Sequence, residues 1–172
     1  MAMTDENIFF VCLMGSGKTT IGKLLALKLK KKFYVTDQKI EKKSGVNISI
    51  IFELEGEEGF RKREAQMIDE LTEKKDIVLA TGGGVVINAE NCALLKSRGK
   101  VIYLHAKPDN LAKRMKHDKV RPLLQQGNML DTLNHLYGER HHLYLAVADF
   151  IVDTGHQKTQ IILNKIEALL TS

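Results

Sequence analysis

The 172-residue sequence has no tryptophan, only two prolines and two cysteines, and 6% aromatic residues. Its cysteines, Cys12 and Cys92, stand in no CxxC or other ligand spacing, which argues against a disulfide framework and a structural zinc site. Few aromatics argue against a single-strand nucleic-acid binder, since such proteins interleave aromatic and basic side chains. The prolines are Pro108 and Pro122, and no low-complexity stretch, linker or internal repeat is present. We therefore expect one domain over residues 1–172.

Long apolar runs are also absent, and none approaches the roughly 20 residues needed to span a bilayer. Residues 1–7 lack the charged-then-apolar order of a signal peptide. The chain has 26 Lys and Arg against 21 Asp and Glu, a net charge of +5 with the histidines neutral. This excess favours an anionic ligand without separating nucleic acid from small phosphates or carboxylates. We expect a cytoplasmic monomer with small-molecule partners and no nucleic-acid or membrane partner.

Short apolar runs rich in β-branched and aromatic residues alternate with longer amphipathic segments. Buried parallel strands have this appearance. The predicted strands cover residues 8–13, 33–36, 77–80, 101–104 and 150–152. The alternation predicts an α/β fold, a three-layer doubly wound parallel sheet with helices on both faces.

Three segments between the strands have features of their own. Residues 88–98 predict a helix with Asn88 as its N-cap, ending at Gly99. Residues 48–74 contain no clear strand and predict consecutive helices, an insertion rather than a sheet element. Residues 117–128 form a polar loop, for which a plain surface loop and a lid or binding loop are both open interpretations.

The first predicted strand leads directly into a glycine-rich run that opens the first helix, Gly15-Ser16-Gly17-Lys18-Thr19. Glycines let successive backbone N–H groups curl around phosphate oxygens, aided by the positive end of the helix. In such a loop Lys18 reaches the β- and γ-phosphates, the Thr19 hydroxyl binds Mg²⁺, and Thr20 contacts the region of the α-phosphate. The alternative is a glycine-rich turn in an unrelated fold. Strand, loop and helix in this order predict nucleotide binding.

Later segments carry runs of glycine, arginine and glutamate, namely Glu57-Glu58-Gly59-Phe60-Arg61-Lys62-Arg63-Glu64, Thr81-Gly82-Gly83-Gly84 and Val120-Arg121-Pro122-Leu123-Leu124. A further segment combines Glu139-Arg140 with Leu143-Tyr144. Together with the glycine-rich loop, these segments resemble the shikimate kinase family, in the same order and at similar spacing. The resemblance extends from the first predicted strand almost to the end of the chain.

The resemblance implies the P-loop fold of nucleoside monophosphate kinases, with a five-stranded sheet. It also implies a helical substrate-binding insertion at about residues 38–74 and a lid at about 117–128. The implied reaction is ATP-dependent phosphorylation of the 3-hydroxyl of shikimate to shikimate 3-phosphate, on the route to chorismate and the aromatic amino acids. Such an enzyme is a phosphotransferase with an alcohol acceptor, ATP as co-substrate and Mg²⁺ as its metal.

From their positions in the family motifs, the resemblance implies that Arg61 and Arg140 hold the carboxylate of shikimate. A guanidinium group can bind a carboxylate through two parallel charge-assisted hydrogen bonds. Without the motif, each of these arginines could equally be an ordinary surface charge. Glu64, one helical turn after Arg61, is placed to pair with it. Gly83 follows the third strand, where its N–H is expected to contact substrate; a flexible turn is the alternative.

Asp37 follows the second predicted strand and resembles the family aspartate that accepts a hydrogen bond from the attacking hydroxyl. A carboxylate there orients the nucleophile and accepts its proton. The alternative is an N-cap for a helix over residues 38–44. The catalytic residues that the resemblance implies are Lys18, Asp37 and Arg121.

The remaining implied contacts concern the nucleotide. Arg121 is expected over the β- and γ-phosphates when the lid closes, where it neutralises charge and excludes water. Arg114 and residues 152–154 resemble the parts that flank adenine, and Gln157 is a further candidate. Two other functions stay open from the residues alone: a kinase for another small polyol or a nucleoside monophosphate, and a catalytically weakened nucleotide-binding module with a regulatory or RNA-binding role.

Three positions depart from the family pattern: Cys12, Val35 and His142. Cys12 replaces the first glycine of the phosphate loop, a change that matters only if the position needs a positive φ. His142 stands where the family segment has proline. Val35 replaces the first aspartate of an Asp-Thr-Asp or Asp-Ser-Asp triplet that ordinarily helps to hold Mg²⁺, and valine offers the water shell of the metal no acceptor.

We predict that the chain needs more Mg²⁺ for half-maximal kinase activity than its Val35→Asp variant. Losing a side chain that hydrogen-bonds to the ligands of a metal typically lowers the metal affinity by about 10–100-fold. Because ATP itself chelates Mg²⁺, the difference between the two titrations should be smaller. The measurement is a Mg²⁺ titration of both proteins at fixed free ATP. Superimposable curves would show that Val35 is only a strand residue.

Overall fold

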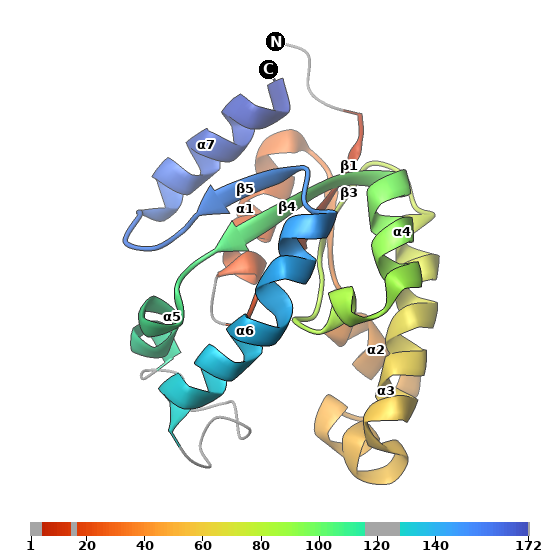
Figure 1. Ribbon diagram of the computed structural model, residues 1–172. Helices are drawn as coiled ribbons and strands as arrows, with labels where there is room; N and C mark the ends of the chain where they lie inside the picture. Colours follow the sequence, from red (N-terminus) through yellow and green to blue (C-terminus); the bar gives the residue numbers. More distant parts are fainter. Residues whose placement is uncertain (1–4, 15–16, 116–127, 172) are drawn as a thin grey trace.

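The computed structural model describes residues 5–14, 17–115 and 128–171, and in these ranges it contains a five-stranded parallel sheet. The strands run in the order β2-β3-β1-β4-β5 (Figure 1). They are β1 (Asn7–Val11), β2 (Lys32–Val35), β3 (Ile77–Ala80), β4 (Gly99–His105) and β5 (Phe150–Asp153). No end differs from the sequence prediction by more than two residues, and the doubly wound α/β fold is confirmed.

The central strands form the middle of the hydrophobic core. Every residue of β1 and β3 is buried. These strands have helices on both faces and strands on both edges, so they are apolar without alternation, as expected for the interior of a parallel sheet. Asn7 is the polar exception, and its side chain is satisfied by the carbonyl of Lys74 at 2.7 Å and the N–H of Ile77 at 3.0 Å.

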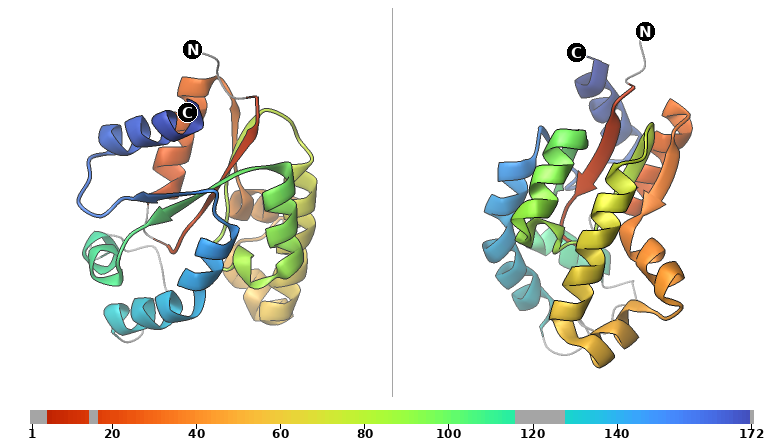
Figure 2. Two further views of the ribbon diagram at one scale, coloured as in Figure 1. Left: turned by 45° about the horizontal axis from the view of Figure 1, so that its top comes forward. Right: turned by 90° about the vertical axis from the view of Figure 1, so that its right-hand side faces the viewer.

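Helices cover both faces of the sheet (Figure 2). On one face lie α1 (Lys18–Leu29) and α7 (Thr159–Thr171). On the other lie α4 (Ala89–Arg98) and α6 (Met129–Val147), and α5 (Pro108–Met115) packs beside α6. Among the described residues no helix is both long and apolar enough to cross a membrane.

Helix α4 begins and ends where predicted, but its C-cap residue, Gly99, is not left-handed. The Asn88 side chain accepts hydrogen bonds from the N–H groups of Glu90 and Asn91 at 2.8 and 3.4 Å, which makes it the N-cap. Gly99 has an extended backbone (φ −178°) and already belongs to β4, so it is not a left-handed C-cap. A Cβ on Gly99 would lie 2.6 Å from the carbonyl oxygen of Asn7, so glycine is needed there for close strand pairing.

Two consecutive helices connect β2 to β3, as predicted for the insertion. They are α2 (Thr36–Ser44) and α3 (Ile48–Thr72). A kink at Gly56, with φ 72° and ψ −178°, divides α3. The kink lets Phe52 stack on Phe60 with centroids 4.7 Å apart. Glycine is required at the kink because side chains rarely adopt this backbone conformation.

The strand order places the loops after β1, β2 and β3 next to one another. From β1 the chain builds β2 and β3 on one side of the sheet and then β4 and β5 on the other. In open α/β sheets the crevice at this reversal, outside the carboxyl ends of the strands, is where ligands bind. The fold therefore brings together the loops that carry the predicted functional residues.

We predict opposite stability effects for two glycine-to-alanine substitutions. Gly99→Ala forces a methyl group against the backbone of β1 and should lower the free energy of unfolding by about 1–3 kcal/mol. Gly138→Ala adds a methyl group at an exposed position of α6 where a Cβ meets nothing within 4 Å. It should raise that free energy by about 0.5–1 kcal/mol. Urea unfolding of both variants measures the difference, and equal shifts would contradict the packing described for Gly99.

Candidate active site

The described end of the glycine-rich loop opens α1. Gly17 is the N-cap residue and has a left-handed backbone (φ 81°, ψ 17°). The first turn of α1 follows, formed by Lys18, Thr19 and Thr20, with Lys18 half-buried and both threonines exposed. Backbone N–H groups in a first turn have no helical acceptor and lie at the positive end of the helix dipole. This geometry fits an anion such as a phosphate group.

Cys12, in place of the first glycine of the loop motif, causes no backbone strain. In the part of the chain that the structure describes, the non-glycine residues with positive φ are Lys30 and Asp76 only. Cys12 is fully buried in the core. The substitution is therefore compatible with the loop. Gly15 and Ser16, two other predicted phosphate contacts, lie outside the described residues.

Three glycines after β3 form the floor of the candidate site. A Cβ on Gly82 would lie 3.1 Å from both Asp37 Oδ1 and Glu64 Oε2. A Cβ on Gly83 would lie 3.5 Å from Nη1 of Arg140. The Arg61 guanidinium occupies the space that a side chain on Gly84 would need. Four charged side chains from α2, α3 and α6 thus converge on backbone that carries no side chains.

Asp37 lies in the first turn of α2, so its predicted alternative as an N-cap is wrong. The helix begins at Thr36, and its N-cap residue is Val35, whose side chain makes no capping hydrogen bond. The buried Thr36 hydroxyl donates to the carbonyl of Ala80 on β3 at 3.3 Å, which ties the start of the helix to the sheet. Asp37 is therefore not the N-cap residue, and the helix dipole favours the negative charge of its carboxylate.

Arg61 is held by acidic side chains and an aromatic ring of its own helix. Its Nη1 donates to Glu64 Oε1 at 2.9 Å, and its Nη2 lies 3.5 Å from Glu57 Oε1. The guanidinium carbon is 5.3 Å from the centroid of the Phe60 ring, within cation–π range. The expected pairing of Glu64 with Arg61 is confirmed, and it fixes the direction of the guanidinium.

Glu64 is 1% exposed, which is unusual for a carboxylate. Burial raises the pKa of the Glu64 carboxyl above its ordinary value, and the negative charge of Asp37 adds to the rise. The positive charges of Arg61 and Arg140 act in the opposite direction. Two acids and two guanidinium groups therefore interact electrostatically in one small region.

Tyr144 joins Arg140 to the glycine floor, a contact that the sequence prediction missed. The Tyr144 hydroxyl donates to the carbonyl of Gly83 at 2.5 Å, and its side chain is fully buried. Burial raises the pKa of Tyr144, while the neighbouring Arg140 guanidinium acts in the opposite direction. The available signal was the i, i+4 spacing of the two residues, which puts both on one face of α6.

Several buried polar atoms of this region have no hydrogen-bond partner among the described residues. They are Nε of Arg61, Nε of Arg140 and Oε2 of Glu64. Leaving such an atom unsatisfied costs about 1–3 kcal/mol, and more when the group is charged. Two guanidinium groups with unused donors, beside carboxylate acceptors, are suited to a ligand that carries both a carboxylate and hydroxyl groups.

The predicted adenine side lies at the ends of β4 and β5. Nη2 of Arg114 donates to the carbonyls of Thr154 and Gly155 at 2.6 and 2.7 Å. The Thr154 hydroxyl donates to the carbonyl of His105 at 3.2 Å. Gln157 is exposed on the same loop. Arg114 therefore holds the loop in place through its backbone carbonyls. Arg121 lies outside the described residues.

The model of the family described as "SKI: Shikimate kinase" matches residues 14–171. The chain belongs to the shikimate kinase family. A shikimate kinase of Cupriavidus pinatubonensis is 52% identical over 160 residues, 93% of this chain and 83% of that protein. One of Nitrosococcus oceani is 51% identical over 164 residues, 95% of this chain and 86% of that protein.

Solved structures of shikimate kinases have the same fold. The enzyme of Acinetobacter baumannii in complex with shikimate has a TM-score of 0.92 and 43% identity, covering 98% of this chain and 94% of that one. A gluconokinase of Sinorhizobium meliloti 1021, at 16% identity and a TM-score of 0.61, covers 99% of this chain and 94% of that one and shares the fold alone. The chain is accordingly a phosphotransferase with an alcohol acceptor, and it phosphorylates shikimate with ATP as co-substrate and Mg²⁺ as the metal.

The residues of this shikimate kinase fit Mg²⁺. In the described ranges no group of three or more His, Cys, Asp or Glu side chains could hold a metal ion. Mg²⁺ does not need such a group, because it keeps several waters and binds phosphate oxygens beside one or two protein ligands. The exposed hydroxyl of Thr19, in the first turn of α1, is the candidate ligand. Val35, at the end of β2, offers no acceptor.

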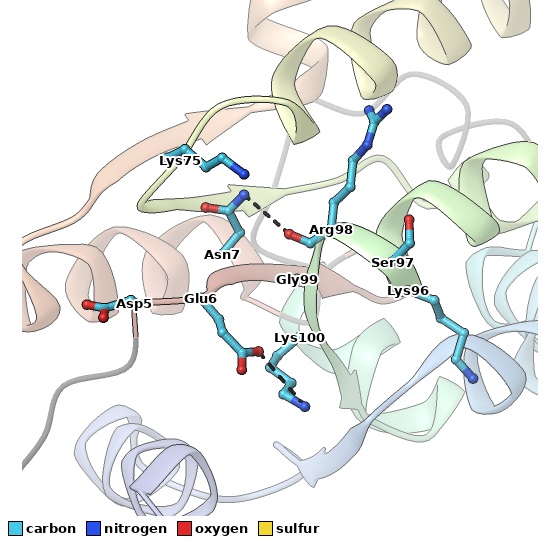
Figure 3. A pocket seen from close by; sticks show the side chains of 9 residues that line it. All are labelled: Asp5, Glu6, Asn7, Lys75, Lys96, Ser97, Arg98, Gly99 and Lys100. Carbon is cyan, nitrogen blue, oxygen red and sulfur yellow. Dashed lines mark hydrogen bonds and ion pairs between the residues drawn. The ribbon is translucent and has the colours of Figure 1, made fainter.

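A hollow of about 420 Å³ lies at the opposite end of the sheet, around the start of β1 and β4 (Figure 3). Its charged side chains are paired in part: Lys100 lies 3.9 Å from Glu6, and Arg98 lies 2.8 Å from Asp69 outside the hollow. None of the predicted site residues lines it. The carboxyl end of the sheet therefore remains the candidate active site.

We predict that Arg61→Lys and Arg140→Lys each raise the KM for shikimate by about 10-fold or more, since lysine cannot make the two-pronged contact. The affinity for ATP, measured without shikimate by titration calorimetry, should change by less than about twofold because the sites are distinct. Lys62→Ala, at an exposed position next to Arg61, is the control and should change neither value. A fall in ATP affinity as large as the change in KM would place these arginines on the nucleotide side.

Proposed function

We propose that Asp37, Arg61, Gly83 and Arg140 form the acceptor site in which the 3-hydroxyl of shikimate receives the γ-phosphoryl group of ATP. The observation that carries this proposal is the convergence of charged side chains on the glycines after β3. Arg61 and Arg140 hold the carboxylate, and the Gly83 N–H contacts the ring. The Acinetobacter baumannii enzyme was solved with shikimate bound and is 43% identical to this chain, which supports shikimate as the acceptor.

Asp37 orients the attacking hydroxyl and accepts its proton. The new bond joins the hydroxyl oxygen to the γ-phosphorus, the bond to the bridging oxygen of ADP breaks, and the proton moves to the Asp37 carboxylate. Glu64 remains beside Asp37 and holds Arg61 in place. Mg²⁺ held through Thr19 would neutralise charge on the phosphates.

The nucleotide site comprises the glycine-rich loop and the loop after β5. Gly17, Lys18, Thr19 and Thr20 bind the phosphates, with Lys18 on the β- and γ-phosphates and Thr19 also on the metal. Arg114 and Gln157 flank the adenine. For Gly15, Ser16 and Arg121 the proposal rests on the sequence motifs alone.

We propose one kinase domain over residues 1–172, with a substrate-binding insertion at about 38–74. The helices α2 and α3, which fill most of this range, support the insertion. The proposed lid, at about 117–128, lies outside the described residues except for its last residue. The enzyme acts as a cytoplasmic monomer on small molecules, without nucleic-acid or membrane partners.

We expect the purified protein to release ADP from ATP when shikimate is present and to release little without it. A coupled assay for ADP measures this. Gluconate and nucleoside monophosphates serve as alternative acceptors, and turnover of one of them with no response to shikimate would contradict the proposed function.

Asp37→Asn in the same assay separates chemistry from binding. Asparagine keeps the shape of the side chain but cannot take a proton, so kcat should fall by about 10²–10⁴-fold while ATP binding is nearly intact. Gln38→Ala, at the next and exposed position, is the matched control and should retain the parent kcat. Turnover of Asp37→Asn within a few-fold of the parent would remove Asp37 from the catalytic role.

A further inference from the structure

Two tyrosines and two histidines form a cluster of rings between β4 and α6, which we call the ring cluster: Tyr103, His105, Tyr137 and His141. Tyr103 and His105 are two residues apart on a strand, and Tyr137 and His141 are four apart on a helix, so each pair shares a face. The Tyr103 hydroxyl lies 2.8 Å from Nδ1 of His141. The Tyr137 hydroxyl lies 2.8 Å from Nε2 of His105. The strand β4 and the helix α6 therefore each contribute one tyrosine and one histidine, and each tyrosine forms a hydrogen bond with the histidine of the other element.

Ring contacts add directional packing to these hydrogen bonds. Tyr137 and His141 stack with centroids 4.5 Å apart and planes 14° apart. The rings of His105 and His141 are 5.3 Å apart, and Tyr103 meets His105 edge to face at 5.5 Å. Turning α6 about its axis would break both hydrogen bonds and the contact between the His105 and His141 rings together. The ring cluster therefore fixes the rotation of α6 against β4, beside which α6 lies (Figure 1).

The same turn of α6 carries the candidate acceptor-binding residues. Arg140 directly precedes His141, and Tyr144 follows His141 by three residues. Tyr144 donates its hydroxyl hydrogen to Gly83 O, and its ring lies 5.0 Å from that of Tyr103. The rotation that the ring cluster sets is therefore also the rotation that directs Arg140 at the glycine floor.

The hydrogen bond between Tyr103 and His141 is shielded from water. Burial raises the pKa of Tyr103, so its hydroxyl keeps its proton. The tautomer of His141 decides which of the two groups donates. Tyr103 is 2% exposed, so water is not a ready substitute for the His141 ring as its partner.

The surroundings of His105 favour its neutral imidazole. Burial lowers the pKa of His105, and the charges of His141 and Lys107 act in the same direction. Asp153 on β5 acts in the opposite direction. The other titratable group that faces His105 from α6 is Tyr137. The groups that face His141 are Tyr103, His105 and Tyr137, and its neighbour in sequence is the cationic Arg140.

We propose that His141, held by the buried hydroxyl of Tyr103, is a positioning residue for acceptor binding. The ring cluster sets the rotation of α6 and thereby aims Arg140 at the carboxylate of shikimate. This inference rests on the proposed function, because it takes Arg140 as a ligand of the carboxylate. A role in packing alone would need the rings and not the Tyr103 hydroxyl.

The test compares steady-state kinetics of the parent, Tyr103→Phe, His141→Ala and His141→Asn. Tyr103→Phe keeps the ring and removes the hydroxyl, and His141→Ala removes the acceptor. Each should raise the KM for shikimate by about 3–10-fold, the effect of one lost hydrogen bond, with kcat and the KM for ATP within about twofold of the parent. His141→Asn presents an acceptor near the former Nδ1 and should keep the parent KM at about pH 7.5.

His142→Ala is the matched control, because His142 is the next residue and is exposed. It should match the parent in kcat and in both KM values. The inference is overturned if Tyr103→Phe and His141→Ala keep the parent KM for shikimate, or if His141→Asn raises that KM as much as His141→Ala does. If Arg140→Lys also leaves the KM unchanged, the proposed acceptor site itself fails; if Arg140→Lys raises the KM and the ring-cluster variants do not, only the positioning role fails.

Discussion

The whole acceptor site depends on bare backbone at the carboxyl end of β3. Because Gly82, Gly83 and Gly84 carry no side chains, charged groups from three helices can approach one strand end at the same time. Any larger residue at Gly84 would displace the Arg61 guanidinium and with it the salt bridge to Glu64. The sheet supplies a rigid edge, and the glycines keep that edge open.

A balance of charge makes such crowding possible. A single buried carboxylate would favour its neutral form, but Glu64 lies against Arg61, and Arg140 also stabilises its charge. The guanidinium groups of Arg61 and Arg140 keep a hydrogen-bond donor for a ligand, since Nε of each has no protein partner among the described residues. The site is thus organised before any ligand arrives, which reduces the cost of binding a carboxylate.

Much of this arrangement could be predicted from the sequence, because local rules carry it. Buried parallel strands appear as short apolar runs, and Asn88 is the predicted cap because its side chain competes for nearby N–H groups. The prediction that Asp37 follows the second strand is confirmed, but its alternative as an N-cap is wrong. The helix begins one residue earlier, at Thr36, whose hydroxyl is hydrogen-bonded to the carbonyl of Ala80 on β3. The link between Tyr144 and Gly83 could not be predicted, since these residues are 61 positions apart and only the packing of α6 brings them together.

That long-range hydrogen bond has a consequence for the way the protein is made. The phosphate loop, Asp37, Arg61 and the glycine floor leave the ribosome before Arg140 and Tyr144 do. Until α6 arrives, the carbonyl of Gly83 and the buried Glu64 lack neighbours that the folded protein provides. A nascent chain therefore cannot complete its acceptor site before α6 is made, and a completed acceptor site shows that the chain has folded from Asp37 to Tyr144.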